Sequence, residues 1–237
     1  MQSTILLPQV KFSYSQFKFS SEMILITGGR KPSAVWFNDL RELRRDCKIF
    51  CVDHGIDFCR ENDILPEILI GDLDSAESSS IEWVMDNKIK IERHPVDKDF
   101  TDTQLALQNF QEISEDKFFI ITGAFGGRLD HLYSTLFTCA NSKIKNCLTD
   151  EQETVIFLNG GESIKLEFVE IPFALSLLPL SETCDGVSID GVHWELNSAS
   201  LSQKLPNAVS NRVESNIVKI SVTSGKLAVY LYFQHQS

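Results

Sequence analysis

Short apolar runs alternate with amphipathic segments through the first half of the chain. Runs typical of strands lie at residues 23–26, 48–52, 67–70, 88–93 and 117–122, with helix-like segments between them. The clearest helical period is the apolar series Leu129, Leu132, Tyr133, Leu136, Phe137 and Ala140. This alternation predicts an α/β unit, a doubly wound, Rossmann-like parallel sheet with right-handed crossovers.

The pattern changes near residue 150. Beyond it the apolar runs are short and strand-like, at 154–158, 163–168, 174–178, 187–189, 217–222 and 226–233. We therefore expect an α/β domain over residues 23–148 and a C-terminal antiparallel β-sandwich over residues 149–237. Residues 1–22 are weakly patterned and are expected to form a leader, whose order the sequence leaves open.

Composition narrows the classes of function. The 237-residue chain has a net charge of −11 and a pI near 4.9, whereas a nucleic-acid binder normally shows a basic face. The longest apolar run, Ile171 to Leu180, is too short to span a membrane. The six cysteines form no Cys-x-x-Cys pair, which favours reduced, buried thiols in a cytoplasmic protein.

Acidic side chains follow two successive predicted strands. Asp72 and Asp74 come directly after the strand at 67–70, and the segment 97–102 (Asp-Lys-Asp-Phe-Thr-Asp) comes after the next strand. Carboxylates that alternate along a backbone are hard oxygen ligands, which suit a Mg²⁺ ion bound to a polyphosphate. For either segment taken alone, a solvated turn remains an alternative because Asp is common in turns.

A glycine-rich turn that ends in an arginine, Gly126-Gly127-Arg128, follows the strand at 117–122 and precedes a predicted helix. Backbone amides at such a position, with a guanidinium beside them, suit a phosphate. The turn is neither a Walker A loop nor a G-x-G-x-x-G turn. Taken alone, it is therefore a weak signal.

Two further acids are placed by their neighbours. Thr101 to Gln104 has the spacing of a capping box, which puts Asp102 in the first turn of a helix. Asp53 directly follows the strand at 48–52. Because ligands of doubly wound sheets bind beyond the carboxyl ends of the strands, we expect all these segments to converge on one cleft. They predict Mg²⁺-dependent phosphoryl or pyrophosphoryl transfer.

The set of motifs resembles the thiamine pyrophosphokinase family. The matching segments are Val52-Asp53-His54-Gly55, Gly71-Asp72-Leu73-Asp74-Ser75, Asp97 to Asp102, Gly126 to His131, and Ser210-Asn211. The resemblance implies an α/β nucleotide-binding domain followed by a β-sandwich, and a homodimer with thiamine bound between subunits. It also implies transfer of pyrophosphate from ATP to the thiamine hydroxyl.

The resemblance also implies roles for single residues. The Mg²⁺ ligands and catalytic acids are Asp72, Asp74 and Asp102, and Lys98 and Arg128 are catalytic cations. The nucleotide site contains Asp53, Gly55, Asp99, Thr101, Gly126, Gly127, Arg128 and Asp130. The thiamine site contains Trp194, Ser210 and Asn211. From its surroundings in the sequence alone, Trp194 fits a sandwich core equally well.

Two positions depart from the family pattern, and two other functions remain as alternatives. His54 stands where relatives carry a glycine, and Lys98 where some carry a glutamine. Asp72-Leu73-Asp74 after a strand also resembles the phosphatases that use an aspartate nucleophile, which would hydrolyse phosphate esters. A nucleotide sensor without catalysis could use the same cleft.

Overall fold

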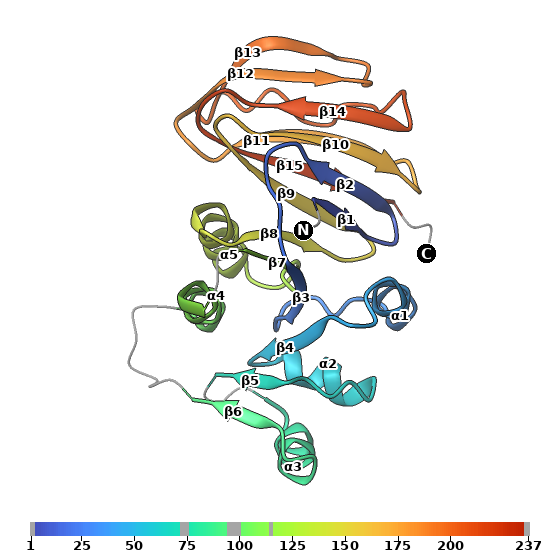
Figure 1. Cartoon of the computed structure of the whole chain (residues 1–237), viewed down its shortest axis with the longest axis vertical. Helices are drawn as coiled ribbons and strands as arrows, with labels where there is room; N and C mark the ends of the chain where they lie inside the picture. Colours follow the sequence, from blue (N-terminus) through green and yellow to red (C-terminus); the bar gives the residue numbers. More distant parts are fainter. Residues whose placement is uncertain (1–2, 72–75, 94–100, 114–115, 235–237) are drawn as a thin grey trace. The chain divides into compact units, whose positions relative to one another are not determined.

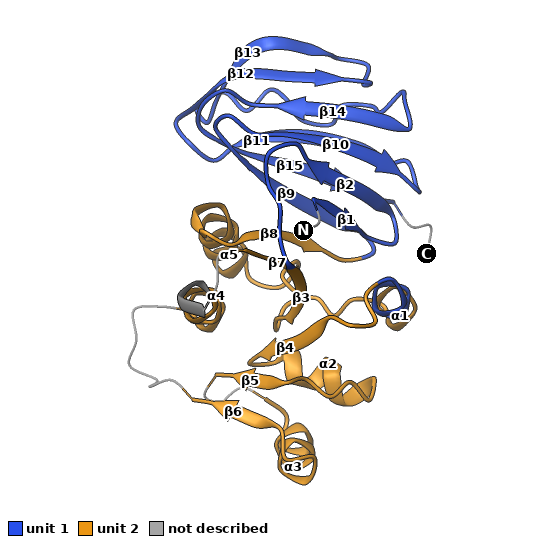
Figure 2. Ribbon diagram, viewed as in Figure 1, with its two compact units in different colours: residues 1–20, 38–43, 151–237 blue, residues 21–37, 44–150 orange. Residues whose placement is uncertain are grey.

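The structure is a computed structural model that describes residues 3–71, 76–93, 101–113 and 116–234, with the backbone alone for residues 111–113. Its contacts separate the chain into two units (Figure 2). Unit 1 comprises residues 1–20, 38–43 and 151–237, and unit 2 comprises residues 21–37 and 44–150. Helix α1 (Ala34–Leu43) has residues in both.

Unit 2 is built on a parallel sheet. In the described residues its strand order is β8-β7-β3-β4-β5-β6, and every neighbouring pair is parallel. The strands are β3 (Ser21–Ile26), β4 (Lys48–Val52), β5 (Ile68–Ile70), β6 (Lys90–Glu92), β7 (Lys117–Thr122) and β8 (Lys145–Thr149). Figure 1 shows α2 (Gly55–Glu61) and α3 (Ser78–Asp86) on one face, and α4 (Asp102–Ile113) and α5 (Leu129–Asn141) on the other. The predicted doubly wound fold is confirmed.

Strand β3 lies where the chain order of this sheet reverses. Strands β4, β5 and β6 extend the sheet on one side of β3, and β7 and β8 extend it on the other. Ile24, Leu25 and Ile120 in the central strands are fully buried, as expected for a parallel sheet covered on both faces. Loops that leave such a reversal point in opposite directions create a crevice for a ligand. The topology therefore places a candidate site where β3 and β7 end.

Unit 1 is an antiparallel β-sandwich, as predicted. One sheet has the strand order β1-β2-β10-β14-β12-β13, and the strands β11-β15-β9 form the other layer of this unit. The strands are β1 (Thr4–Leu6), β2 (Val10–Tyr14), β9 (Glu153–Asn159), β10 (Ser163–Phe168), β11 (Ala174–Pro179), β12 (Thr183–Asp190), β13 (Leu196–Ser202), β14 (Ile217–Ser221) and β15 (Lys226–Tyr232). The Tyr14 hydroxyl donates to the Phe157 carbonyl at 3.1 Å, so a buried hydrogen bond joins the layers.

Residues 4–14 correct the expectation of a leader. They form β1 and β2, and β2 pairs antiparallel with β10 of the sandwich. Phe12 and Tyr14 are buried, whereas Lys11 and Ser13 on the other face are partly exposed. The period-two pattern is present in the sequence, but it is short, and the strand that it pairs with is distant in the chain. Unit 1 therefore takes in the N-terminus as well as residues beyond 150.

Three further differences concern single elements. Strands β8 and β13 were not predicted, since β8 is interrupted by Asn146 and β13 is mostly polar and exposed. The helix α5 was predicted, but its apolar stripe is buried only toward the end of the helix. Leu129 and Tyr133 are 79% and 62% exposed, while Cys139 and Ala140 near the end of the helix are buried. Helix α5 thus leaves apolar side chains on the surface of the described chain.

The helices and the cysteines bear on two expectations from composition. In the described part of the chain, the helices are too short or too polar to cross a membrane. All six cysteines are free thiols, and five of them are buried, as the sequence predicted. Burial raises the pKa of Cys47, the remaining one, to about 11, so this thiol stays protonated at neutral pH.

Two neighbouring cations of the β3–α1 loop, Arg30 and Lys31, form ion pairs that differ in burial. The Nε and Nη2 atoms of Arg30 donate to Asp150 Oδ2 at 2.9 and 2.7 Å, and the Asp150 carboxylate is fully buried. The next residue, Lys31, pairs at 2.6 Å with Glu61, and both side chains are exposed. We expect Asp150→Ala to lower the free energy of unfolding by about 3 kcal/mol, because it leaves a partly buried cation. Glu61→Ala should cost less than about 1 kcal/mol. Urea denaturation measures both, and equal losses would contradict the argument.

Candidate active site

A cleft of about 520 Å³ lies within unit 2, at the carboxyl ends of β3, β4 and β7. It occupies the crevice that the strand order predicts. The predicted site residues that line it are Asp53, Thr101, Asp102, Gly126, Gly127 and Arg128. Three of the segments that the strand-exit argument named, around Asp53, Asp102 and the turn at 126–128, therefore meet there, together with the loop after β3.

The loops after β3 and β7 are joined backbone to backbone. The amides of Thr27, Gly29 and Arg30 donate to the carbonyls of Thr122, Gly123 and Phe125, at 2.8, 2.6 and 2.6 Å. A side chain on Gly29 would come within 2.5 Å of the Gly123 carbonyl oxygen, and one on Gly123 would strike the Thr27 carbonyl. The two glycines thus permit a contact that continues the sheet past its strand ends and forms the floor of the cleft.

The turn from β4 into α2 is also held by a glycine. A side chain on Gly55 would collide with the carbonyl oxygen of Ile26 at the end of β3. Gly55 is buried and is not among the residues that line the cleft. The structure therefore indicates a packing role for Gly55, whereas the resemblance had placed it in the nucleotide site.

Asp53 has a left-handed backbone, with φ +46°, in the same turn. Its amide donates to the Ile70 carbonyl at 3.1 Å, and its carboxylate lies against Gly71, where a side chain would collide with it. Asp72 follows Gly71 directly in the sequence. Asp53 thus lines the cleft. It also contacts the end of β5, and the Asp72-Leu73-Asp74 motif follows directly in the sequence.

The predicted capping box at the start of α4 is present. The Thr101 amide donates to Gln104 Oε1 at 2.7 Å, and the Gln104 amide donates to Thr101 Oγ1 at 3.3 Å. These reciprocal bonds satisfy two amides that the first helical turn leaves open. Asp102 lies in that first turn and faces the cleft. The helix dipole favours its negative charge.

Arg128 precedes α5 and is held by Asp130. Its Nε and Nη2 atoms donate to the two carboxylate oxygens of Asp130, at 3.1 and 2.6 Å. These bonds hold the pKa of Asp130 below its usual value and raise the pKa of Arg128. Both side chains are exposed, at 74% and 63%, so the pair contributes orientation more than stability. Asp130 supports Arg128 and does not itself line the cleft.

Four predicted residues lie outside the described residues: Asp72, Asp74, Lys98 and Asp99. Within the described ranges, no group of three or more acidic, histidine or cysteine side chains could hold a metal. The cleft does receive the carboxylates of Asp53 and Asp102. Asp102, Asp72 and Asp74 would together offer only carboxylate oxygens, which are the ligands that Mg²⁺ prefers.

A second cavity of about 550 Å³ lies within unit 1 and brings together the three predicted thiamine-side residues. Trp194, Ser210 and Asn211 all line it, together with apolar side chains such as Leu177 and Leu201. Trp194 is 60% exposed, so the alternative that it belongs to the sandwich core is wrong. An exposed indole at the rim of an apolar cavity offers its face to a ligand.

Asn211 holds the backbone of Trp194. Its Nδ2 donates to the Trp194 carbonyl at 2.8 Å, and its Oδ1 accepts from the Trp194 amide at 3.1 Å. The Ser210 amide donates to Ser176 Oγ at 3.0 Å, and Ser210 has a left-handed φ of +58°. The Ser210-Asn211 motif therefore fixes one wall of the cavity through its hydrogen bonds.

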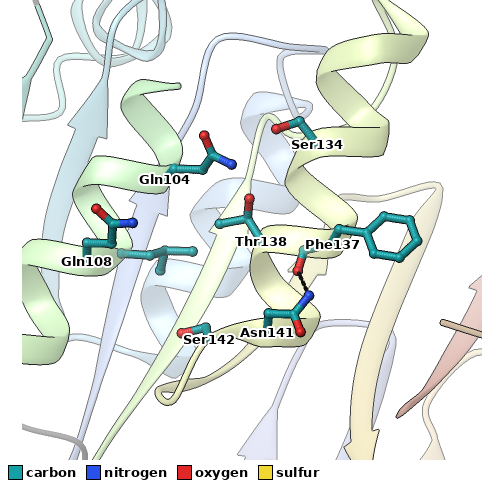
Figure 3. A pocket seen from close by; sticks show the side chains of 8 residues that line it. Gln104, Gln108, Ser134, Phe137, Thr138, Asn141 and Ser142 are labelled. Atoms are coloured by element: carbon teal, nitrogen blue, oxygen red, sulfur yellow. Dashed lines mark hydrogen bonds between the residues drawn. The ribbon is translucent and has the colours of Figure 1, made fainter. Parts of the chain in front are cut away.

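A third cavity, of about 370 Å³, separates α4 from α5 in unit 2 (Figure 3). Neutral side chains line it, among them Gln104, Gln108, Thr138 and Asn141. The Asn141 side chain donates to the Phe137 carbonyl at 2.7 Å within its own helix. Because this lining carries no charge in the described residues, the cavity is a poor site for a phosphate.

Some lining residues of the main cleft were not predicted. They include Gly28, Gly29 and Gly123, and the histidines His54 and His131. The glycines carried a signal, since they follow the apolar runs of β3 and β7 directly. Both histidines lie in motifs that match the family, Val52 to Gly55 and Gly126 to His131, but neither was assigned a role of its own.

The fold and the site together define a protein in which an α/β unit holds a charged cleft at its reversal point and a β-sandwich unit holds an aromatic-walled cavity. Residues 41–149 match the family model described as thiamin pyrophosphokinase, catalytic domain. Residues 165–227 match the model described as thiamin pyrophosphokinase, vitamin B1 binding domain. The chain belongs to the thiamine pyrophosphokinase family of enzymes, as its motifs indicated.

Relatives and solved structures agree with this membership. The chain is 27% identical over 165 residues to the thiamine pyrophosphokinase of Bacillus subtilis, a match that covers 68% of this chain and 76% of that protein. It is 25% identical over 168 residues to thiamine pyrophosphokinase 1 of rice, covering 67% of this chain and 63% of that protein.

Solved structures of other proteins share the fold, among them the following two. The Bacillus subtilis thiamine pyrophosphokinase superposes with a TM-score of 0.78 at 22% identity, over 91% of this chain and all of that one. The thiamin pyrophosphokinase of Candida albicans superposes with a TM-score of 0.75 at 15% identity, over 99% of each chain. At these identities the likeness establishes the architecture.

The close approach of α2 to β3 generates a stability prediction. Gly55→Ala places a methyl group against the Ile26 carbonyl, which is backbone and cannot rotate away. We expect a loss of about 1–3 kcal/mol in the free energy of unfolding. Gly161→Ala is the control, because its added methyl group meets nothing within 4 Å. It should lower the free energy of unfolding by about 1 kcal/mol, because alanine disfavours the left-handed φ of +86° at this position. Thermal unfolding that ranks Gly161→Ala as the worse variant would contradict the packing role.

Proposed function

We propose that this protein transfers a pyrophosphoryl group from ATP to the hydroxyl of thiamine, giving thiamine diphosphate and AMP, and that the reaction requires Mg²⁺. One observation carries the proposal. The same chain combines a cleft lined by carboxylates and an arginine at the reversal point of its parallel sheet with an aromatic-walled cavity. That cavity lies in the region matched by the vitamin B1 binding model.

We assign the metal to three carboxylates. Asp72, Asp74 and Asp102 would hold Mg²⁺, which when bound supplies positive charge to the phosphate oxygens of ATP. Asp102 is held at the cleft by the capping box of α4. Catalysis by this set is mainly positioning and charge stabilisation, since phosphoryl transfer requires little covalent chemistry from the protein.

Arg128 supplies a further charge for the phosphates. Asp130 holds its guanidinium in a two-bond contact beside the cleft that Arg128 lines. A guanidinium held in one orientation suits a phosphate, whose oxygens can accept two parallel hydrogen bonds. We propose that Lys98 adds to this charge, and that Asp99 and Thr101 complete the nucleotide site.

Thiamine is proposed to bind in the unit 1 cavity. The face of Trp194 would contact the cationic ring system of thiamine, an interaction favourable by about 0.5–2 kcal/mol. Ser210 and Asn211 would shape the wall beside it by their hydrogen bonds to Ser176 and Trp194.

The family resemblance adds a homodimer with thiamine bound between subunits, which we also propose. The exposed apolar side chains Leu129 and Tyr133 on α5 support an interface, because contiguous apolar surface often marks one. The free thiols of the chain support a reducing compartment, which we take to be the cytoplasm.

The reaction is tested by measuring AMP and thiamine diphosphate formed from ATP and Mg²⁺, with and without thiamine. We expect thiamine-dependent AMP in equal amount to the product. Phosphate release without thiamine dependence would replace the proposal with a phosphatase, and ATP binding without turnover would replace it with a nucleotide sensor.

The metal carboxylates are tested in the same assay. Asp72→Asn and Asp102→Asn should each lower turnover by about 100-fold or more, because a preorganised charge at the phosphates is lost. The melting temperature should change little, since neither change creates a cavity. Asp86→Asn is the control, an exposed acid of α3 away from the cleft, and should keep normal turnover. A near-normal rate for Asp72→Asn would refute the metal assignment.

The thiamine cavity has its own test. Trp194→Ala should raise the KM for thiamine about tenfold and leave the KM for ATP nearly unchanged, with a smaller effect for Trp194→Phe because a ring face is kept. Phe173→Ala is the control, since Phe173 is a 67% exposed aromatic of the same unit and does not line the cavity. An equal rise in both KM values would show that Trp194 acts through the fold instead.

A further inference from the structure

His54 is the residue of the main cleft that the family pattern does not explain. It lines the cleft, and its side chain is 49% exposed. It occupies the N-cap position of α2 but makes no side-chain capping bond among the described residues. A side chain on Gly28 would begin 2.7 Å from His54 Cβ, so the imidazole is rooted directly over the turn that follows β3. Its ring is therefore available to a ligand in the cleft.

A buried carboxylate holds one side of this ring. His54 Nδ1 lies 3.4 Å from Asp57 Oδ2, and the Asp57 side chain is 7% exposed. The other oxygen of Asp57 accepts the Glu77 amide at 3.2 Å, which fixes the carboxylate at the start of α3. Because a carboxylate accepts hydrogen bonds, we assign the ring proton to Nδ1. In the neutral ring, Nε2 is then an acceptor that needs a donor from the ligand.

The position of His54 in the fold identifies that donor. In doubly wound sheets, an acid about 20 residues beyond the first glycine turn, at the end of the second strand, accepts a hydrogen bond from the ribose of a bound nucleotide. Asp53 occupies that position after β4, but its Oδ1 is buried and its carboxylate lies against Gly71. The next residue, His54, also lines the cleft, and its half-exposed ring offers a second acceptor beside Asp53.

The loops that line the cleft differ in what they offer an anion. The amides of Thr27, Gly29 and Arg30 after β3 are engaged by the β7 loop, so they are not offered to an anion. In the turn before α5, Gly127 has open space around it and Arg128 carries a charge. With the phosphates of a nucleotide near Arg128, His54 remains as a partner for another part of that nucleotide, because it lines the same cleft.

We propose that His54 is a specificity-determining residue for the ribose of the nucleotide: its Nε2 accepts a hydrogen bond from a ribose hydroxyl, and Asp57 is the positioning residue that fixes the ring. The inference rests on the proposed function, in that it requires a nucleotide in this cleft. A glycine at position 54 could not make this contact to the ribose.

The test compares ATP with 2′-deoxy-ATP and 3′-deoxy-ATP as substrates. The unmodified enzyme should discriminate against one of the deoxy nucleotides by about five- to tenfold in kcat/KM, the value of one neutral hydrogen bond. His54→Gly should reduce that ratio to near one by weakening the use of ATP alone. His54→Gln, which keeps an acceptor, should restore part of it. Glu82→Gln is the control, an exposed acid of α3 that does not line the cleft, and should keep the full ratio.

Asp57 is tested by a double-mutant cycle. Asp57→Asn should reduce the ratio in the unmodified enzyme and change nothing further when combined with His54→Gly, because its effect passes through the ring. A purely structural role would lower stability and the use of all three nucleotides alike, in either background. Direct binding of the three nucleotides, measured by calorimetry, should show the same ratios without turnover.

The outcomes separate the two proposals. Absence of thiamine-dependent AMP with ATP in the unmodified enzyme overturns the proposed function. Normal turnover with a deoxy ratio that His54→Gly leaves unchanged overturns the role of His54 alone. An equal loss with all three nucleotides in His54→Gly also overturns it, since the contact would then be to the phosphates or to the fold.

Discussion

The backbone contact between the exits of β3 and β7 is the constraint on which the candidate site depends. Three amides of one loop donate to three carbonyls of the other, and glycines at positions 29 and 123 leave no side chain in the way. Buried amides and carbonyls must be paired, so this contact satisfies the loops internally and lets them run below the cleft. Gly55 applies the same principle where α2 meets β3. The cleft is therefore a consequence of tight backbone packing at strand ends, and its side chains stand on a rigid floor.

The two units provide different chemistry from different elements. In unit 2, charged groups stand at helix starts and strand exits, where the helix dipole and nearby amides favour anions, and Asp102 and Arg128 are each fixed by a neighbour in their own segment. In unit 1, the cavity has an exposed indole and apolar walls, and Asn211 holds the indole's backbone from a distant segment. One site thus gathers charged groups at a cleft, and the other gathers an exposed indole and apolar side chains at a cavity.

Local sequence pattern predicted what local forces determine. The helical period of residues 129–140, the capping box at Thr101 and the glycine-arginine turn at 126–128 all appear where the sequence indicated. Pattern alone failed where a partner decides the outcome. Val10–Tyr14 forms a strand because β10 pairs with it, and Leu129 and Tyr133 of the α5 stripe are exposed because burial depends on what packs against them. No period in a sequence reports such a partner.

By itself, the sequence determined the elements of the α/β unit other than β8, its doubly wound topology and the identity of the acids and glycines at the strand exits, because these follow from short-range periodicity and from chain connectivity. The tertiary structure decided which of those residues meet. In the tertiary structure, Gly55 packs against the Ile26 carbonyl, and Trp194 lines a cavity. The His54 ring lies beside the buried carboxylate of Asp57. These outcomes depend on distances between segments far apart in the chain, and only the packed fold determines such distances.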